Sequence, residues 1–303
     1  MSSIKTKDHL VFFLCKSIAA VLGNLPNGLF MLIELFLVKV AVLFAGKDRR
    51  IIYANIHRVY ALPAFSNFSK RFATQCLASN LRSSLETLRG IQKFDRLKLL
   101  GLEDVRVELE KLGDGPGIFI TSHLGSWELA GGVLARASQK KFFGLAKPAK
   151  NPGFSRFLNS VRERLGIHVI WTGKPSLMKE MMAVLKSGNL LGFVMDQKPG
   201  TLNSPIVPFF GIPTPFVSGP ASMALHFKAP IYSIHVVREG AMTFRVILKN
   251  IAYSESLSPL ALTEILALEL ERVIRIYPEQ WSWNYKRWKS KANEVLSNVK
   301  QST

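Results

Sequence analysis

His123 and Glu128 are the side chains whose types and spacing best suit catalysis in this chain, and they lie five residues apart. The apolar run 118–120, which precedes them, is typical of a buried strand. The Leu- and Ala-rich run 127–136 is typical of a helix, with Ser126 available as its N-cap. In open α/β sheets, ligands bind outside the carboxyl ends of strands, which is where His123 falls.

A histidine at such a place can accept a proton near neutral pH, while a nearby carboxylate fixes its tautomer and stabilises the imidazolium. His123 and Glu128 therefore form a candidate general-base pair. Backbone N–H groups near Gly125, at the start of the helix, are candidate donors to an oxyanion. A structural role is the alternative, because a lone histidine at a strand end often only packs and a glutamate in a first helical turn complements the helix dipole.

The rest of the chain alternates strand and helix patterns, which is typical of a mostly parallel central sheet flanked by helices. We therefore predict an α/β fold. Asp196 and Gln197 again stand at a strand end. The predicted strands are 142–146, 168–171 and 190–196, the predicted helices are 103–112, 152–165, 176–186, 218–228 and 260–277, and a hairpin is predicted at 231–238 and 242–251.

Two apolar segments, 9–23 and 29–46, hold the apolar excess of the chain. The second is just long enough to cross a bilayer, which takes about 20 residues. Its two charges, Glu34 and Lys39, make a simple lipid-facing span energetically less favourable. Cations flank both ends of the apolar region, which favours cytoplasmic placement of both ends, as in a shallow hairpin.

We therefore expect residues 1–46 to anchor the protein to a membrane and residues 47–303 to form the catalytic domain. A buried helix pair within the fold is the alternative. A signal peptide is disfavoured because Lys16 interrupts the apolar region and Asn-Leu-Pro-Asn is a poor cleavage site.

The chain carries a formal net charge of +19, which attracts nucleic acid, an acidic protein or an anionic lipid surface. Much of this charge lies in the predicted helical stretch 49–97, where it can face solvent or rest on lipid headgroups. The two cysteines, Cys15 and Cys76, have no metal-ligand spacing and fit a reducing compartment.

Two further segments are rich in apolar or aromatic residues. The Pro- and Phe-rich segment 207–216 is odd on a water-facing surface, and exposed apolar patches mark contacts with a partner, a ligand or a membrane. The tail 278–288 places three tryptophans beside cations. It can cover the core, form an interfacial aromatic belt or stack on nucleic acid bases.

These residues resemble a known family. His-Leu-Gly-Ser-Trp-Glu at 123–128 resembles the HX4(D/E) signature of glycerolipid acyltransferases, in the form of the lipid A biosynthesis lauroyl/myristoyl acyltransferases. Lys147 stands where that family usually has Arg. Further segments match in type and order, namely Lys147-Pro-Ala-Lys-Asn151, Arg162-Glu-Arg-Leu-Gly166, Asp196-Gln197, Pro208-Phe-Phe-Gly211 and Trp281-x-Trp-x-x-x-Arg-Trp-Lys289.

The resemblance implies a membrane-associated enzyme that transfers a fatty acyl chain from an acyl-carrier-protein thioester to a hydroxyl of a lipid A precursor. His123 would be the base and Glu128 the residue that orients it. The residues expected to engage substrate are Lys147, Asn151, Arg162, Arg164 and Asp196.

No Gly-x-Ser-x-Gly elbow is present, so direct transfer without an acyl-enzyme is expected. No cofactor is expected beyond the acyl donor. The expected location is the inner membrane, with the active site facing the cytoplasm and its anionic surface.

Three alternatives remain open at this point. Another lipid acceptor, such as a phosphoglycolipid, a lysophospholipid or an aminolipid, would keep the same chemistry. A membrane thioesterase would use the same histidine without an acceptor lipid. A basic nucleic-acid-binding protein is the third, and we expect no nucleic acid partner because that role leaves the apolar segments 9–46 and 207–216 unexplained.

Overall fold

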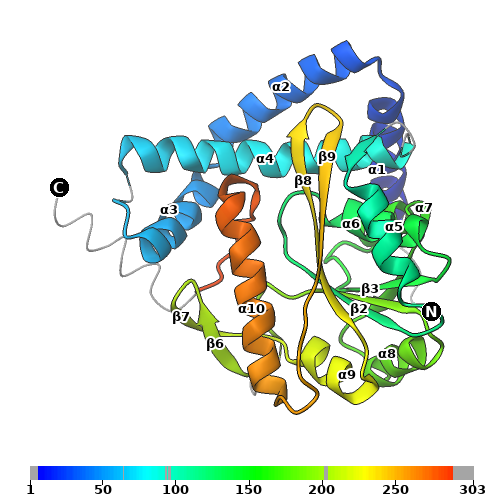
Figure 1. Cartoon of the computed structure of the whole chain (residues 1–303). Helices are drawn as coiled ribbons and strands as arrows, with labels where there is room; N and C mark the ends of the chain where they lie inside the picture. Colours follow the sequence, from blue (N-terminus) through cyan, green and yellow to red (C-terminus); the bar gives the residue numbers. More distant parts are fainter. Residues whose placement is uncertain (1–5, 64, 93, 95–96, 201–203, 289–303) are drawn as a thin grey trace.

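A seven-stranded sheet forms the centre of the computed structural model, which describes residues 6–63, 65–92, 94, 97–200 and 204–288. Lys289, named in the tail motif, lies outside this part. Neighbouring strands are parallel except β8 and β9, which form the predicted hairpin (Figure 1). The α/β prediction is therefore confirmed. In spatial order the strands are β1 (Lys98–Leu100), β9 (Thr243–Asn250), β8 (Ile231–Gly240), β2 (Gly117–Thr121), β5 (Leu190–Val194), β3 (Phe142–Ala146) and β4 (Ile167–Trp171).

Helices cover both faces of this sheet. On one face, Ile118 and Ile120 of β2 belong to a core with α8 (Leu177–Lys186), α9 (Gly219–Phe227) and α10 (Pro259–Ile276). On the other face, Phe119 of β2 belongs to a core with α5 (Leu102–Glu110), α6 (Trp127–Ala137) and α7 (Pro152–Arg164). Burial on both faces is the reason why β2 is a continuous apolar run rather than an alternating one.

Four helices come before the sheet in the described part of the chain: α1 (Thr6–Asn24), α2 (Asn27–Phe44), α3 (Gly46–Tyr60) and α4 (Asn67–Gln92). The predicted helical stretch 49–97 is thus divided, and Pro63 lies in the break, where it cannot continue a helix. α4 crosses the sheet at the carboxyl end of β8, where Glu86 pairs with Arg238 at 2.9 Å (Figure 1). Within the described residues, α2 is the helix that is long and apolar enough to cross a membrane.

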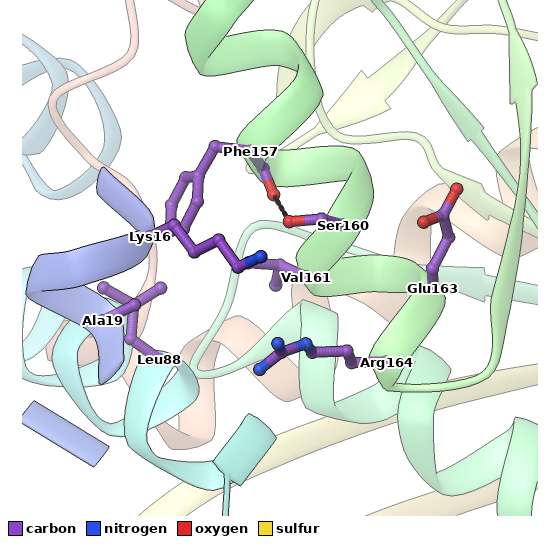
Figure 2. A pocket seen from close by; sticks show the side chains of 8 residues that line it. All are labelled: Lys16, Ala19, Leu88, Phe157, Ser160, Val161, Glu163 and Arg164. Atoms are coloured by element: carbon purple, nitrogen blue, oxygen red, sulfur yellow. Dashed lines mark hydrogen bonds between the residues drawn. The ribbon is translucent and has the colours of Figure 1, made fainter. Parts of the chain in front are cut away.

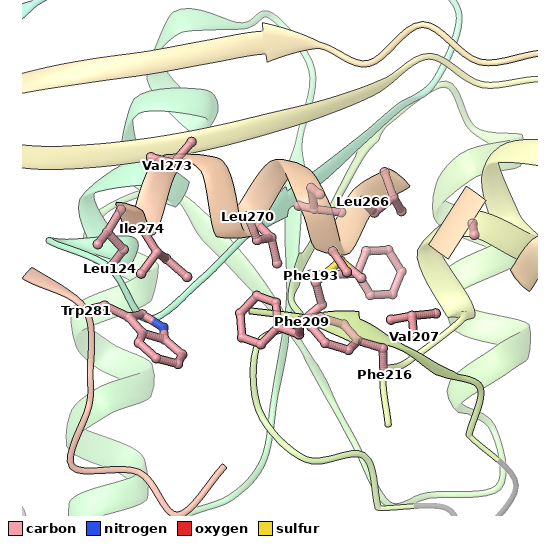
Figure 3. Packing of buried hydrophobic residues seen from close by; sticks show 14 of the residues in the cluster. Leu124, Phe193, Val207, Phe209, Phe216, Leu266, Leu270, Val273, Ile274 and Trp281 are labelled. Atoms are coloured by element: carbon pink, nitrogen blue, oxygen red, sulfur yellow. The ribbon is translucent and has the colours of Figure 1, made fainter. Parts of the chain in front are cut away.

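The phenylalanines of the apolar segment 207–216 are buried, although Pro208, Gly211 and Pro213 are exposed. It forms a two-stranded hairpin of β6 (Ile206–Phe209) and β7 (Ile212–Pro215), and Phe209 and Phe216 are fully buried. Figure 3 shows these rings packed beneath Leu266 and Leu270 of α10. The prediction of an exposed apolar patch here is wrong because α10 covers the hairpin.

The tail after α10 forms part of the core. It begins as a short 3₁₀ helix, η2 (Pro278–Gln280), and Trp281, Trp283 and Trp288 that follow are all buried. Trp281 packs against Phe209 with ring centroids 5.9 Å apart. Of the three roles considered for the tail tryptophans, the structure therefore supports core cover, because rings with no exposed face can neither stack on bases nor enter a lipid interface.

Candidate active site

His123 and Asp196 meet at the carboxyl edge of the sheet. β2 and β5 are neighbours in parallel register with Thr121 opposite Val194, so the residues two positions further on lie side by side. His123 Nδ1 lies 2.7 Å from Asp196 Oδ1, and the His123 backbone N–H donates to Asp196 Oδ2 at 2.9 Å. An ionised carboxylate only accepts hydrogen bonds, so Nδ1 carries the proton and Nε2 of the neutral ring is the basic atom.

The tail holds this pair in place. Trp281 Nε1 donates to Asp196 Oδ2 at 2.7 Å, and the Ser282 backbone N–H donates to the His123 carbonyl at 3.0 Å. The Asp196 residue is only 2% exposed. Its carboxylate therefore receives three hydrogen bonds in a buried place, which fixes both its position and its charge.

The pKa of His123 is raised above its ordinary value of 6.5. Burial by itself lowers this pKa, but the hydrogen-bonded Asp196 carboxylate, with a smaller contribution from Glu128, outweighs burial. The pKa of Asp196 is lowered although burial raises it, because the imidazolium of His123 and the indole N–H of Trp281 stabilise the carboxylate. The pair is thus suited to hold a proton on the ring during a reaction.

The side chain of Gln197 is hydrogen-bonded to the basic atom of His123. Its side-chain Nε2 lies 3.1 Å from His123 Nε2 and is the donor, since Nδ1 holds the ring proton. A hydroxyl that loses its proton to His123 must reach this same position. Gln197 therefore either moves aside or contacts the arriving group. The sequence pattern placed Gln197 beside Asp196 at a strand end but indicated no role for its side chain.

Glu128 does not hold the ring of His123. Arg162 of α7 donates to its carboxylate through Nη2 at 2.6 Å and through Nε at 3.0 Å. The expectation that Glu128 orients the imidazole is therefore corrected, because the contact with Nδ1 belongs to Asp196. Glu128 still contributes negative charge near the ring.

The two backbone N–H groups nearest Gly125 already have acceptors. The Gly125 N–H donates to the Gln280 carbonyl at 3.0 Å and the Ser126 N–H to the Val236 carbonyl at 2.8 Å. They are therefore not free to bind an oxyanion, contrary to expectation. The Ser126 hydroxyl makes no cap either, because it bonds Thr87 of α4 at 2.6 Å. The N–H groups of the first turn of α6, from Trp127 onward, are the remaining candidates.

Asn151 and Lys147 lie beyond the carboxyl end of β3. Asn151 is the N-cap of α7, where its side-chain oxygen accepts from the Phe154 N–H at 2.8 Å, and its amide contacts Asp8 of α1 at 3.4 Å. Lys147 is exposed. The structure thus gives Asn151 a capping role, and the substrate-binding roles predicted for both residues stay predictions.

Arg164 lies apart from Arg162 and lines a cavity of about 320 Å³ between α1, α4 and α7. Figure 2 shows Lys16 and Arg164 reaching into this cavity from α1 and α7, while Glu163 lies on the other side. None of the residues that bond His123 or Asp196 lines it. Helix α7 therefore directs Arg162 to Glu128 and Arg164 to this separate cavity.

Both cysteines are free thiols, with Cys76 buried in the core. In the part of the chain that the structure describes, no three His, Cys, Asp or Glu side chains gather in a way that could hold a metal ion.

Replacing Trp281 with phenylalanine should lower kcat by about ten- to hundredfold, because a hydrogen bond to a charged group contributes about 1.5–3 kcal/mol. Trp283→Phe is the matched control. Trp283 is equally buried and its Nε1 donates to the Pro278 carbonyl at 2.6 Å, away from Asp196. Steady-state kinetics of the two folded variants would test the prediction, and equal kcat values would contradict it.

Gly125→Ala should lower the free energy of unfolding by about 2–5 kcal/mol. Gly125 has φ +58°, and a Cβ there would collide with the Val236 carbonyl. Holding a residue with a Cβ in the left-handed backbone conformation costs about 1–2 kcal/mol. The steric clash of the added Cβ costs about 1–3 kcal/mol more, as overpacking does in a core. Gly113→Ala, at φ +48° with nothing within 4 Å, should show only the first cost. Urea unfolding in detergent measures both, and equal losses would contradict the collision.

Two comparisons with known proteins bear on this site. A family model for bacterial lipid A biosynthesis acyltransferases matches residues 3–290. A phosphatidylinositol mannoside acyltransferase of Mycolicibacterium smegmatis is 28% identical over 168 residues, which is 55% of this chain and 54% of that relative. The chain therefore matches about half the length of that relative.

Proposed function

This chain belongs to the bacterial lipid A biosynthesis acyltransferase family, and from that premise we propose that it transfers a fatty acyl group from an acyl-carrier-protein thioester to a hydroxyl of a lipid A precursor. The observation that carries the proposal is the His123–Asp196 hydrogen bond of 2.7 Å at the carboxyl edge of the sheet. It leaves Nε2 of His123 as a base next to a buried, charged partner.

In the proposed reaction, His123 Nε2 takes the proton of the acceptor hydroxyl as the hydroxyl oxygen attacks the thioester carbonyl. The C–O bond forms, the C–S bond breaks, and the imidazolium returns the proton to the thiolate of the donor. Asp196 stabilises the imidazolium throughout, as the carboxylate of a catalytic triad does. Glu128, held by Arg162, adds negative charge that favours the same state.

We propose that the protein is attached to the inner membrane with this site facing the cytoplasm. The apolar helix α2 and the net charge of +19 support the attachment. An acidic carrier protein, a phosphorylated lipid acceptor and an anionic leaflet would all be attracted by that charge.

A different acceptor is the second candidate. The relative of 28% identity is named for phosphatidylinositol mannoside, a glycosylated phospholipid. A glycophospholipid hydroxyl would meet the same base, so the reaction would be unchanged and only the contacts to the acceptor would differ.

Acyl transfer in detergent tests both candidates. The donor is labelled acyl-acyl carrier protein, and the acceptors are a tetra-acylated lipid A precursor, a phosphatidylinositol mannoside, a lysophospholipid and no lipid. Transfer to the lipid A precursor supports the first proposal and transfer only to the mannoside supports the second. Release of free fatty acid at the same rate with and without acceptor would contradict both and indicate a thioesterase.

A further inference from the structure

The first two helices expose an apolar surface on their outer side. Leu32 and Phe36 on α2 are 66% and 63% exposed, and Phe44 is 80% exposed. Large apolar side chains exposed in such number mark a contact with a partner or a membrane. The exposed apolar side chains of the two helices are Leu10, Phe13, Leu14, Ile18, Val21, Leu29, Met31, Leu32, Leu35, Phe36, Val40, Leu43 and Phe44. We name these residues the apolar face.

We propose that α1 and α2 lie in the plane of an anionic phospholipid leaflet with the apolar face buried in it, and that α2 does not cross the bilayer. This proposal deepens the membrane attachment proposed above and does not depend on the acyl-transfer reaction. At 1.5 Å per residue the 18 residues of α2 are about 27 Å long, so length alone would permit a span. The argument against a span comes from the contacts of α2.

One stripe of α2 is docked on α4. Phe30, Glu34 and Val38 follow one another at intervals of four residues and are all buried. Glu34 Oε1 lies 2.9 Å from Nε of Arg82 on α4, and the guanidinium of Arg89 lies 4.3 Å from the centre of the Phe30 ring. Residues four apart share one face of a helix, so α2 presents this stripe to α4 and the rest of its surface to the outside.

A span would carry α4 into the hydrocarbon. Glu34 is close to the middle of α2, so its ion pair would lie near the bilayer centre together with Arg82 and its neighbours. Each charged side chain at that depth costs about 2.5–3.5 kcal/mol. The described part of α4 carries several such groups, namely Lys70, Arg71, Arg82, Glu86 and Arg89.

The segments on both sides of α2 are held by the same domain. α1 packs on α7, where Arg156 lies 4.4 Å from the centre of the Phe12 ring. α3 is bound to the tail, since Asn55 Nδ2 donates to the carbonyls of Trp283 at 2.7 Å and Tyr285 at 2.8 Å. A crossing helix would have to place α1 and α3 on opposite sides of the membrane, which these contacts forbid in the folded protein.

The charge of these helices identifies the leaflet as anionic. Exposed cations lie on the same three helices, and each one near such a surface contributes about 1 kcal/mol to binding. They are Lys7, Lys39, Lys47 and Arg50. An in-plane helix with an apolar outer face and flanking cations is the usual form of a monotopic anchor.

The first test is vesicle flotation of the full chain. Binding to vesicles of phosphatidylglycerol and phosphatidylcholine at about 3:7 should exceed binding to phosphatidylcholine alone by at least about tenfold, given about 1 kcal/mol per cation. Leu32→Gln/Phe36→Gln should lower binding by at least about tenfold. The matched control, Leu268→Gln/Ile276→Gln, changes two exposed apolar residues of α10 and should bind as the wild type does. Equal loss in both variants, or a stable dimer that does not float, would overturn the proposal.

The second test distinguishes an α2 that lies in the membrane plane from an α2 that crosses the bilayer. Asn24→Cys and Lys47→Cys stand just before and just after α2, each in a background with Cys15→Ala and Cys76→Ala. Protein bound from outside to sealed vesicles is treated with a membrane-impermeant maleimide. The in-plane arrangement predicts full labelling of both variants without detergent. Protection of one of them until detergent is added would show a span and overturn the proposal, whether or not acyl transfer is detected.

Discussion

His123→Ala is expected to lower kcat about 10²- to 10⁴-fold, the range in which a positioned general base contributes. The loss should appear in kcat and in kcat/KM alike, because a proton transfer is made only in the transition state. The effect is expected because Nδ1 of His123 is bonded to Asp196, which leaves Nε2 as the basic atom of the ring. Single-turnover transfer from labelled acyl carrier protein measures the effect on chemistry.

His168→Ala serves as the control, because His168 is an exposed histidine of β4 that bonds neither His123 nor Asp196. It should keep the wild-type rate. If His123→Ala transferred acyl groups at the wild-type rate, His123 could not be the base and the proposed mechanism would be abandoned.

Asp196→Asn should produce the second large loss, about 10²- to 10⁴-fold in kcat, because the carboxylate that stabilises the imidazolium is gone while the side-chain shape is kept. The pH profile should also move. In the wild type the pKa of His123 is raised, so the neutral, active ring accumulates as pH rises through a value above 6.5. Without the Asp196 charge, burial lowers this pKa, and the neutral ring is present at lower pH.

The acidic limb of kcat/KM against pH is therefore expected to shift to lower pH in Asp196→Asn, and the rate deficit should be smallest at acidic pH. Glu128→Gln should shift the limb in the same direction but less, since Glu128 has the weaker effect on His123. A larger shift or loss in Glu128→Gln than in Asp196→Asn would return the orienting role to Glu128 and contradict the assignment drawn from the hydrogen bonds.

The local patterns predicted most of the fold. β3 occupies the predicted range 142–146, and α6, α7, α9 and α10 begin or end within one or two residues of their predicted bounds. Such elements depend on apolar periodicity and on nearby Gly and Pro, which are visible in a short stretch of sequence. The placement of His123 at a strand end follows from the same local information.

The hydrogen-bond partners of His123 could not be predicted from the sequence. Glu128 is five residues away in sequence, yet it points to Arg162 on α7, whereas Asp196 is 73 residues away and bonds the ring. Which carboxylate reaches Nδ1 depends on β5 lying beside β2 in a particular register, and a strand pattern carries no information about its neighbour. The indole of Trp281 is placed by the same long-range packing.

By itself, the sequence determined the α/β class, the positions of most elements, the candidate base His123 and the presence of an apolar segment near 29–46, because each depends on local periodicity, turn residues or composition. Only the tertiary structure decided that Asp196 bonds the base, that the phenylalanines of segment 207–216 and the tail tryptophans belong to the core, and that α2 is docked on α4 through Glu34. Those outcomes depend on which surfaces meet, and a single ion pair such as that of Glu34 with Arg82 changes the role of a helix without altering its hydropathy.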